Sequence, residues 1–113
     1  MTQRVHRVTM FKLPKKEDQE KLLALYETVR DTSTKDGKPY ILSMAVGACE
    51  PDQRSQGYDF AAKFEFASLE DMRYYDDECP AHQALKAAAR SLDVGGLMTI
   101  YFKELLTGGH LSH

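Results

Sequence analysis

Residues 58–66 constrain the fold more than any other stretch, because polarity alternates along them. The even positions carry tyrosine, phenylalanine, alanine, phenylalanine and phenylalanine, whereas Asp59, Lys63 and Glu65 stand at odd positions. A period of two is typical of a strand with one buried face. We therefore expect residues 58–66 to form a strand whose even-numbered side chains enter the core.

The segments around this strand predict three further strands and three helices. Strands are expected at 5–12, at about 40–49 and at 97–104, and an amphipathic helix at about 15–30, where Leu22, Tyr26 and Val29 recur at helical spacing. Ser68 is a suitable N-cap for a helix that ends near residue 78, and Pro80 restarts a helix over 81–92. The order matches the α+β, ferredoxin-like β-α-β-β-α-α-β arrangement with an antiparallel sheet.

The size of the chain allows one domain. Its 113 residues leave no room for a second core, so we expect a domain over 1–105 and a flexible tail over 106–113. Helices can cover only one face of such a sheet. The residues expected to need further cover are His6, Val8, Met10, Phe60, Phe64, Met98, Ile100 and Phe102. A second copy of the sheet is the expected cover, which predicts a symmetric homodimer.

Composition excludes several classes of function. A net charge of −2 with interspersed acids and bases argues against nucleic-acid binding. No apolar run approaches the ~18 residues of a membrane span, and no secretory signal is evident, so we expect no membrane partner and a cytoplasmic location. Cys49 and Cys79 lack metal-type spacing, and the acids of 76–78 splay around a helix, so no metal site is expected.

Four motifs together carry a resemblance to a known family. They are Val5-His6-x-Val8-x-x-Phe11-Lys12, Gly57-Tyr58, Phe66-x-Ser68-x-Glu70 and Pro80-Ala81-His82. The chain resembles the stress-responsive dimeric α/β-barrel (Dabb) proteins, which include plant polyketide cyclases of the olivetolic acid cyclase type. The acidic run before Cys79-Pro80 is more similar to fungal members than to plant ones.

The resemblance implies a dimer of ferredoxin-like subunits, each with a small apolar cavity and no cofactor. It implies that His82 is the acid/base group, that Tyr75 orients it or shares its proton, and that His6 faces the cavity. The chain departs from the pattern of the plant cyclases in three ways, one of which is that the alignment of Tyr75 with the family's helix tyrosine shifts by one residue. Phe60 replaces a further cavity histidine, and Cys79 replaces a frequent histidine before Pro-Ala-His.

Each candidate also has a purely structural interpretation. His82 could act as an acid/base group near neutral pH, or its ring could simply bond a nearby backbone carbonyl. His6 and Tyr75 could be core residues with satisfied polar atoms. The expected substrate-binding residues could equally be core; they are Val8, Met10, Phe60, Phe64, Met72 and Tyr74.

Two functions from different classes therefore stay open. One is a cofactor-independent cyclase or lyase that acts on a small, apolar, carbonyl-bearing molecule such as a polyketide. The other is a non-catalytic dimeric stress protein that binds a hydrophobic ligand. Monooxygenases that share the barrel architecture provide a third, redox alternative, which no residue of this chain selects.

Overall fold

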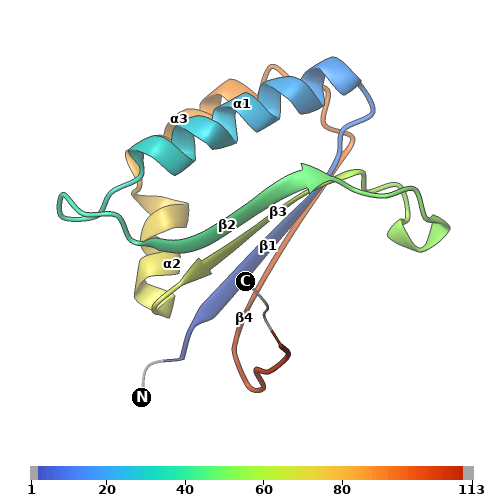
Figure 1. The fold of residues 1–113 in the computed structure, drawn as a ribbon. Coiled ribbons are helices and arrows are strands. Elements are labelled where there is room, and N and C mark those ends of the chain that lie inside the picture. Colours follow the sequence, from blue (N-terminus) through green and yellow to red (C-terminus); the bar gives the residue numbers. More distant parts are fainter. Residues whose placement is uncertain (1–2, 111–113) are drawn as a thin grey trace.

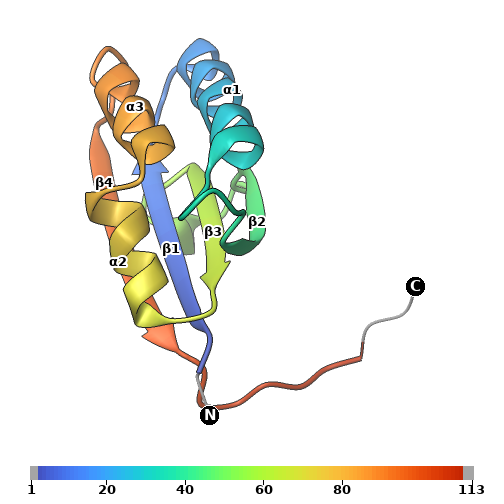
Figure 2. The ribbon, with the colours of Figure 1, turned by 90° about the vertical axis from the view of Figure 1, so that its left-hand side faces the viewer.

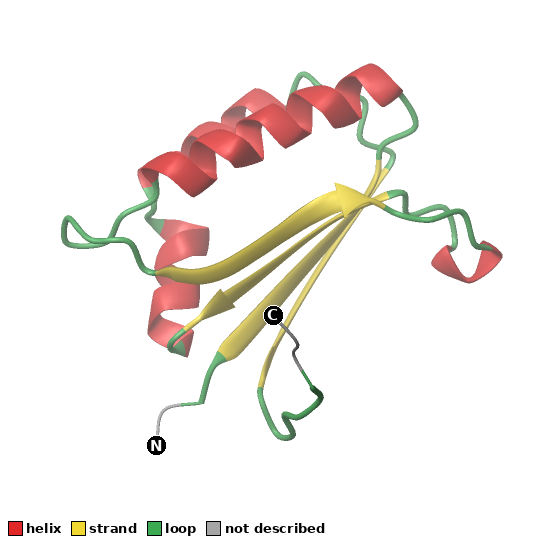
Figure 3. Ribbon diagram, viewed as in Figure 1, coloured by secondary structure: helices red, strands yellow, loops and turns green. Residues whose placement is uncertain are grey.

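Within residues 3–110, the architecture consists of one four-stranded sheet and three α-helices (Figures 1 and 3). It was obtained as a computed structural model, which describes residues 3–110. The elements in chain order are β1 (Val5–Lys12), α1 (Lys16–Thr32), β2 (Ile41–Ala48), a 3-10 turn (Gln53–Ser55), β3 (Phe60–Phe66), α2 (Leu69–Asp77), α3 (Pro80–Ala89) and β4 (Gly96–Lys103). The predicted order of strands and helices is confirmed.

Three predicted boundaries shift for identifiable reasons. β3 begins at Phe60 rather than Tyr58, since Asp59 still lies in the loop, where its carboxylate accepts the Leu13 backbone N–H at 2.6 Å. α3 ends at Ala89 rather than residue 92, where the backbone tightens into a turn. Gly96, expected to precede β4, is its first residue, and a Cβ there would lie 2.9 Å from the Lys12 side chain.

The sheet has the order β2-β3-β1-β4, and every neighbouring pair is antiparallel. α1 and α3 pack against each other over one face of the sheet, as Figure 2 shows. The fold is therefore ferredoxin-like and of the α+β class, as predicted.

The two faces of the sheet differ sharply in burial. Along β1 the odd-numbered residues are buried toward the helices, whereas the even-numbered ones are only partly buried on the open face. The pairing of β3 with β1 places Phe60 opposite Phe11 and Phe64 opposite Arg7, so both phenylalanines lie on the helix side. They are therefore core residues and not part of the open face, to which the sequence had assigned them.

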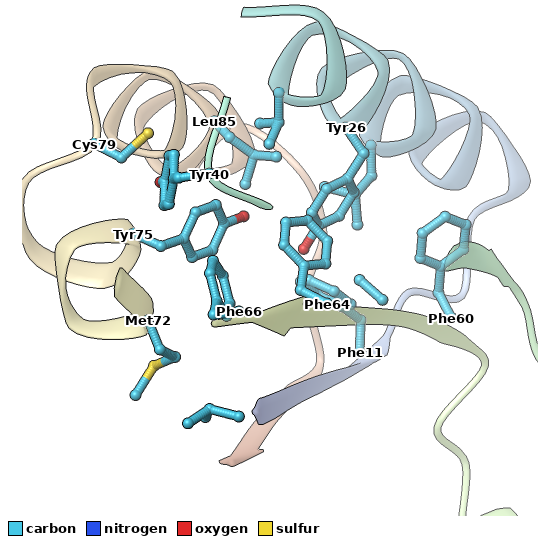
Figure 4. Close-up of a cluster of buried hydrophobic side chains, with 14 of the residues drawn as sticks. Phe11, Tyr26, Tyr40, Phe60, Phe64, Phe66, Met72, Tyr75, Cys79 and Leu85 are labelled. Atoms are coloured by element: carbon cyan, nitrogen blue, oxygen red, sulfur yellow. The ribbon is translucent and has the colours of Figure 1, made fainter. Parts of the chain in front are cut away.

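An aromatic cluster joins β3 to the helices (Figure 4). Phe64 packs between Tyr26 of α1 and Tyr75 of α2, with ring centroids 5.8 Å and 5.0 Å away. Phe66 lies 5.5 Å from the same Tyr75 ring. The alternation seen in residues 58–66 is thus the core-facing side of β3, which confirms that prediction.

The segment after β4 is extended and leaves the body of the domain (Figure 2). Leu105 and Leu106 are each 93% exposed. The predicted tail covers 106–113, of which 111–113 lie outside the described residues. No helix within residues 3–110 is long and apolar enough to cross a membrane.

Candidate active site

The junction between α2 and α3 positions the central side chain of the site. Ser68 caps the start of α2, because its Oγ accepts the Asp71 backbone N–H at 3.1 Å. The last carbonyls of a helix lack partners within it, and α3 supplies them here. Pro80 opens α3 and leaves His82 on the first turn, where its Nδ1 lies 2.8 Å from the Tyr75 carbonyl oxygen. Gln83 and Lys86 of α3 likewise donate to the Asp76 carbonyl.

The contacts of His82 define its tautomer. A carbonyl oxygen only accepts hydrogen bonds, so Nδ1 must carry the proton, and Nε2 of the neutral ring keeps its lone pair. The Nε2 atom has no hydrogen-bond partner among residues 3–110. Burial lowers the pKa of His82 to about 4, although the bond to the Tyr75 carbonyl opposes that shift. His82 is therefore a neutral imidazole near pH 7, with one nitrogen able to accept a proton.

A cavity of about 300 Å³ lies beside His82, between the helices and the strands β1 and β4. This volume is at the lower end of the range for small-molecule sites, roughly 300 to 1,000 Å³. Its wall is largely apolar and includes Phe11, Tyr26, Leu85, Ala89, Val94 and Leu97. Its polar lining consists of Arg7, Thr9, His82, Lys86, Arg90 and Thr99. The cavity can therefore accept a small apolar molecule with a few oriented polar groups.

An ion pair between a buried arginine that lines this cavity and a partly exposed aspartate lies beside it. Arg7 of β1 is 7% exposed, and its Nε and Nη2 lie 3.0 Å and 2.8 Å from one oxygen of Asp76. Its Nη1 donates to Thr9 Oγ1 at 2.8 Å, and Thr9 Oγ1 is 3.0 Å from Thr99 Oγ1 on β4. The guanidinium also lies 5.1 Å from the centre of the Tyr75 ring. One network thus links cavity-lining side chains of β1 and β4 to α2, the helix that holds Tyr75.

Tyr26 brings a phenol to the same cavity. Burial raises the pKa of Tyr26 to about 12, and the nearby Arg7 opposes that rise. The hydroxyl is therefore protonated at neutral pH and can donate a hydrogen bond. A neutral base and a neutral phenol lining one apolar cavity form an arrangement suited to proton transfer.

The three predicted catalytic residues are divided between the two faces of the sheet. Tyr75 stacks on His82, with ring centroids 3.8 Å apart. His6 points to the open face, where it stacks on Phe102 and its Nε2 lies 3.2 Å from Glu104. The sheet therefore separates His6 from His82. Of the three, only His82 lines the cavity.

The predicted substrate-binding residues also lie outside this cavity. Val8 and Met10 alternate with the buried positions of β1 and face the open side. Phe60, Phe64 and Met72 belong to the core, and Tyr74 donates through its hydroxyl to the Thr34 carbonyl at 3.2 Å. The sequence placed these residues on the right strands and helix, but it could not place them around one cavity.

Apart from His82, the sequence predicted none of the residues that line this cavity as site residues, and Arg7, Thr9, Tyr26 and Thr99 are among those it missed. Arg7 left a usable signal, since it stands in β1 between Val5 and Phe11, two positions on the core-facing register. A charged residue in such a register needs a buried partner or a ligand. The two threonines left no signal, because their pairing depends on the register of β4 against β1.

The sequence of this chain matches one family model and is similar to a fungal protein. The model of the stress responsive A/B barrel domain matches residues 5–94. A fusaristatin A biosynthesis cluster protein of Gibberella zeae is 49% identical over 106 residues, which are 94% of this chain and 77% of that protein.

Solved structures resemble the fold at low sequence identity. The hydroxynitrile lyase of Passiflora edulis superposes with a TM-score of 0.76 at 11% identity, over 96% of this chain and 100% of that one. A dimeric ferredoxin-like protein of unknown function from Thermobifida fusca gives a TM-score of 0.72 at 17% identity, over 92% and 93% of the two chains. These likenesses concern the fold. The family match and the Gibberella relative together show that this chain belongs to the stress responsive A/B barrel domain family.

Proposed function

We propose that this protein is a cofactor-independent cyclase or lyase that transfers a proton on a small, apolar, carbonyl-bearing molecule. The observation that carries the proposal is the state of His82. Its Nδ1 is committed to the Tyr75 carbonyl, and its ring is neutral because burial lowers the pKa to about 4. Nε2 is therefore the nitrogen available as a base to a molecule in the cavity.

A carbonyl compound bound there can undergo an intramolecular aldol reaction in three balanced steps. His82 Nε2 takes a proton from the carbon next to a carbonyl, and the electron pair of the C–H bond moves to the oxygen to form an enolate. The enolate carbon then attacks a second carbonyl of the same molecule, which forms a C–C bond and an alkoxide. The imidazolium of His82 returns its proton to that alkoxide. Tyr75 assists as a positioning residue, through its carbonyl and its ring.

Two comparisons support this class of reaction. The Gibberella relative is named for a biosynthesis cluster, which is a context for small-molecule chemistry. One protein of the same fold is a hydroxynitrile lyase. The non-catalytic alternative, a protein that only binds an apolar ligand, would use the same cavity without the proton transfer.

The open face of the sheet supports a homodimer. Its exposed side chains include Met98, Ile100 and Phe102 of β4, which pair across the strands with Met10, Val8 and His6. A contiguous apolar strip of this kind is typical of a protein–protein interface. The Thermobifida protein of the same fold is described as dimeric. We therefore propose that a second copy covers this face.

Hydrogen–deuterium exchange on a simple ketone tests the proposed chemistry. Hexanophenone, an apolar phenyl ketone, is incubated with the protein in D₂O, and loss of its α-proton signal is followed by NMR. We expect the wild-type protein to accelerate the exchange and His82→Asn to abolish the acceleration. Asparagine can still donate to the Tyr75 carbonyl but has no nitrogen at the Nε2 position. His110→Asn, in the exposed terminal segment, is the matched control and should exchange like the wild type.

The results separate the two functions. Equal exchange by the wild type and His82→Asn would contradict the role of His82. A ketone that shifts the NMR signals of residues around the cavity without any exchange would favour the non-catalytic binding protein. Failure of the ketone to bind would contradict the proposed substrate class.

A further inference from the structure

Arg7 is the most unusual residue of the cavity, because a guanidinium at 7% exposure is costly to bury. Its known partners use only part of its hydrogen-bonding capacity. Three of its five N–H groups are directed to Asp76 and Thr9, and the other two have no partner among residues 3–110. Asp76 contributes a single oxygen to the pair. The guanidinium that lines the cavity can therefore donate further hydrogen bonds.

The direction of the hydrogen bonds leaves the hydroxyl hydrogen of Thr99 free to bind a ligand. Arginine has only donors, so Thr9 Oγ1 accepts from Arg7. When the Thr9 hydroxyl donates its hydrogen bond to Thr99 Oγ1, at 3.0 Å, the hydroxyl hydrogen of Thr99 has no acceptor among the described residues. Thr99 lines the cavity. A hydroxyl polarised by a buried cation thus faces the space where a ligand would bind.

From this network we infer that Arg7, Thr9 and Thr99 form an oxyanion site. The carbonyl oxygen of the substrate accepts the Thr99 hydrogen, and the positive charge of Arg7, relayed through Thr9, stabilises the negative charge that develops there. The inference rests on the proposed function and narrows its substrate class to enolisable ketones and phenols, which bind through an oxygen that becomes anionic.

The charges around the cavity agree with an anionic ligand. The charged side chains that line it are Arg7, Lys86 and Arg90, all cations. This is the reverse of the chain as a whole, whose net charge is −2. Asp76, which contacts this group, is already paired with Arg7. An oxyanion in the cavity would therefore meet attraction from its lining, and a cationic ligand would meet repulsion.

A chromogenic phenol measures this preference directly. 4-Nitrophenol changes its absorbance when it ionises, so titration of the bound probe gives its ionisation constant. We expect the wild-type protein to bind the phenolate in preference to the phenol, with the ionisation constant raised at least tenfold over that in water. Thr99→Val and Arg7→Met should each remove most of that increase. Thr28→Val and Arg73→Met change exposed residues of the same types and are the matched controls.

The phenolate titration and the ketone exchange together distinguish failure of the oxyanion site from failure of the proposed catalysis. His82→Asn should lose ketone exchange yet keep the preference for phenolate, because the oxyanion site does not include His82. Binding of the neutral phenol by the wild type, no binding at all, or an unchanged constant in Thr99→Val with a native circular dichroism spectrum would overturn the inference. A phenolate preference that depends on Thr99, in a protein without ketone exchange, would uphold the oxyanion site and contradict the proposed catalysis.

Discussion

The imidazole of His82 lies flat against the phenol ring of Tyr75, with the ring centroids 3.8 Å apart and the planes 11° from parallel. The same tyrosine accepts the His82 Nδ1 proton through its backbone carbonyl. Its hydroxyl, in contrast, is buried and has no hydrogen-bond partner within residues 3–110. Tyr75 therefore holds His82 by its ring and its carbonyl, and the hydroxyl takes no part in that contact.

Tyr75→Phe should leave both the fold and the ketone exchange intact. The change keeps the stacked ring and the carbonyl and removes a buried, unpaired hydroxyl, so we expect stability to be unchanged or higher by about 1 kcal/mol. Tyr75→Ala should cost about 3 to 5 kcal/mol, because the ring fills the core between Phe64 and Phe66. Urea unfolding and the exchange assay measure the two effects. A large loss of exchange in Tyr75→Phe would instead show that the hydroxyl shares the proton.

His82 should make the stability of the protein depend on pH between about 4 and 6.5. Burial lowers its pKa in the folded state to about 4 from the ordinary 6.5, so the unfolded chain binds more protons across this window. Stability is therefore full above pH 6.5 and falls as the pH drops toward 4, by at most ~3 kcal/mol.

Urea unfolding at pH 7 and at pH 4.5 measures this contribution. His82→Asn cannot titrate, so its loss of stability between the two pH values should be smaller than that of the wild type. The difference between the two proteins isolates His82 from the carboxylates that titrate in the same range. Equal losses in both proteins would show that His82 is not held in the neutral form.

Local sequence patterns were sufficient to predict the fold. Polarity alternates along β3, and apolar residues recur at helical spacing in α1. Ser68 and Pro80 stand at the starts of α2 and α3. Each of these patterns depends only on residues that are close together in the sequence. His82 could be singled out for the same reason, since Pro80 sets the direction of its helical turn. The partner that gives His82 its tautomer, the Tyr75 carbonyl, is also only seven residues away.

The cavity itself depends on contacts that no local pattern reveals. His6 and Arg7 are neighbours in the chain, yet β1 directs them to opposite faces of the sheet. The face of the sheet that the helices cover depends on how all four strands and the helices pack together. Thr9 meets Thr99 across 90 positions because β4 pairs with β1 in one register. The resemblance to the cyclases pointed to His6, whereas tertiary packing brought Arg7 to the cavity.

The Arg7–Asp76 pair should respond asymmetrically to the loss of either partner. Asp76→Ala leaves a buried guanidinium without its counter-charge and should destabilise the protein by about 2 to 4 kcal/mol. Arg7→Met replaces the cation with an apolar chain of similar length and should cost about 1 kcal/mol or less, since Asp76 can turn to solvent. The double variant should then be more stable than Asp76→Ala alone.

Chemical unfolding of the three variants tests this asymmetry. Asp31→Ala, which breaks the solvent-exposed pair of Arg30 and Asp31, is the control and should change stability little. Equal effects of Asp76→Ala and Asp31→Ala would mean that water reaches the Arg7 guanidinium freely. A double variant less stable than either single variant would contradict the asymmetry.

Ile100→Asp should convert the proposed homodimer to monomers. Ile100 is 49% exposed on the open face and lies opposite Val8, so a carboxylate there would be buried without a partner if a second sheet covered it. The single subunit should keep its fold, because the side chain at this position does not enter the core between sheet and helices. Leu23→Asp adds the same charge at a comparably exposed leucine of α1, on the helical side, and should leave the assembly unchanged. Light scattering coupled to size exclusion gives the mass of each species, and circular dichroism reports the fold. A wild-type protein that is monomeric at micromolar concentration, or an Ile100→Asp variant that stays dimeric, would show that this face is not the interface.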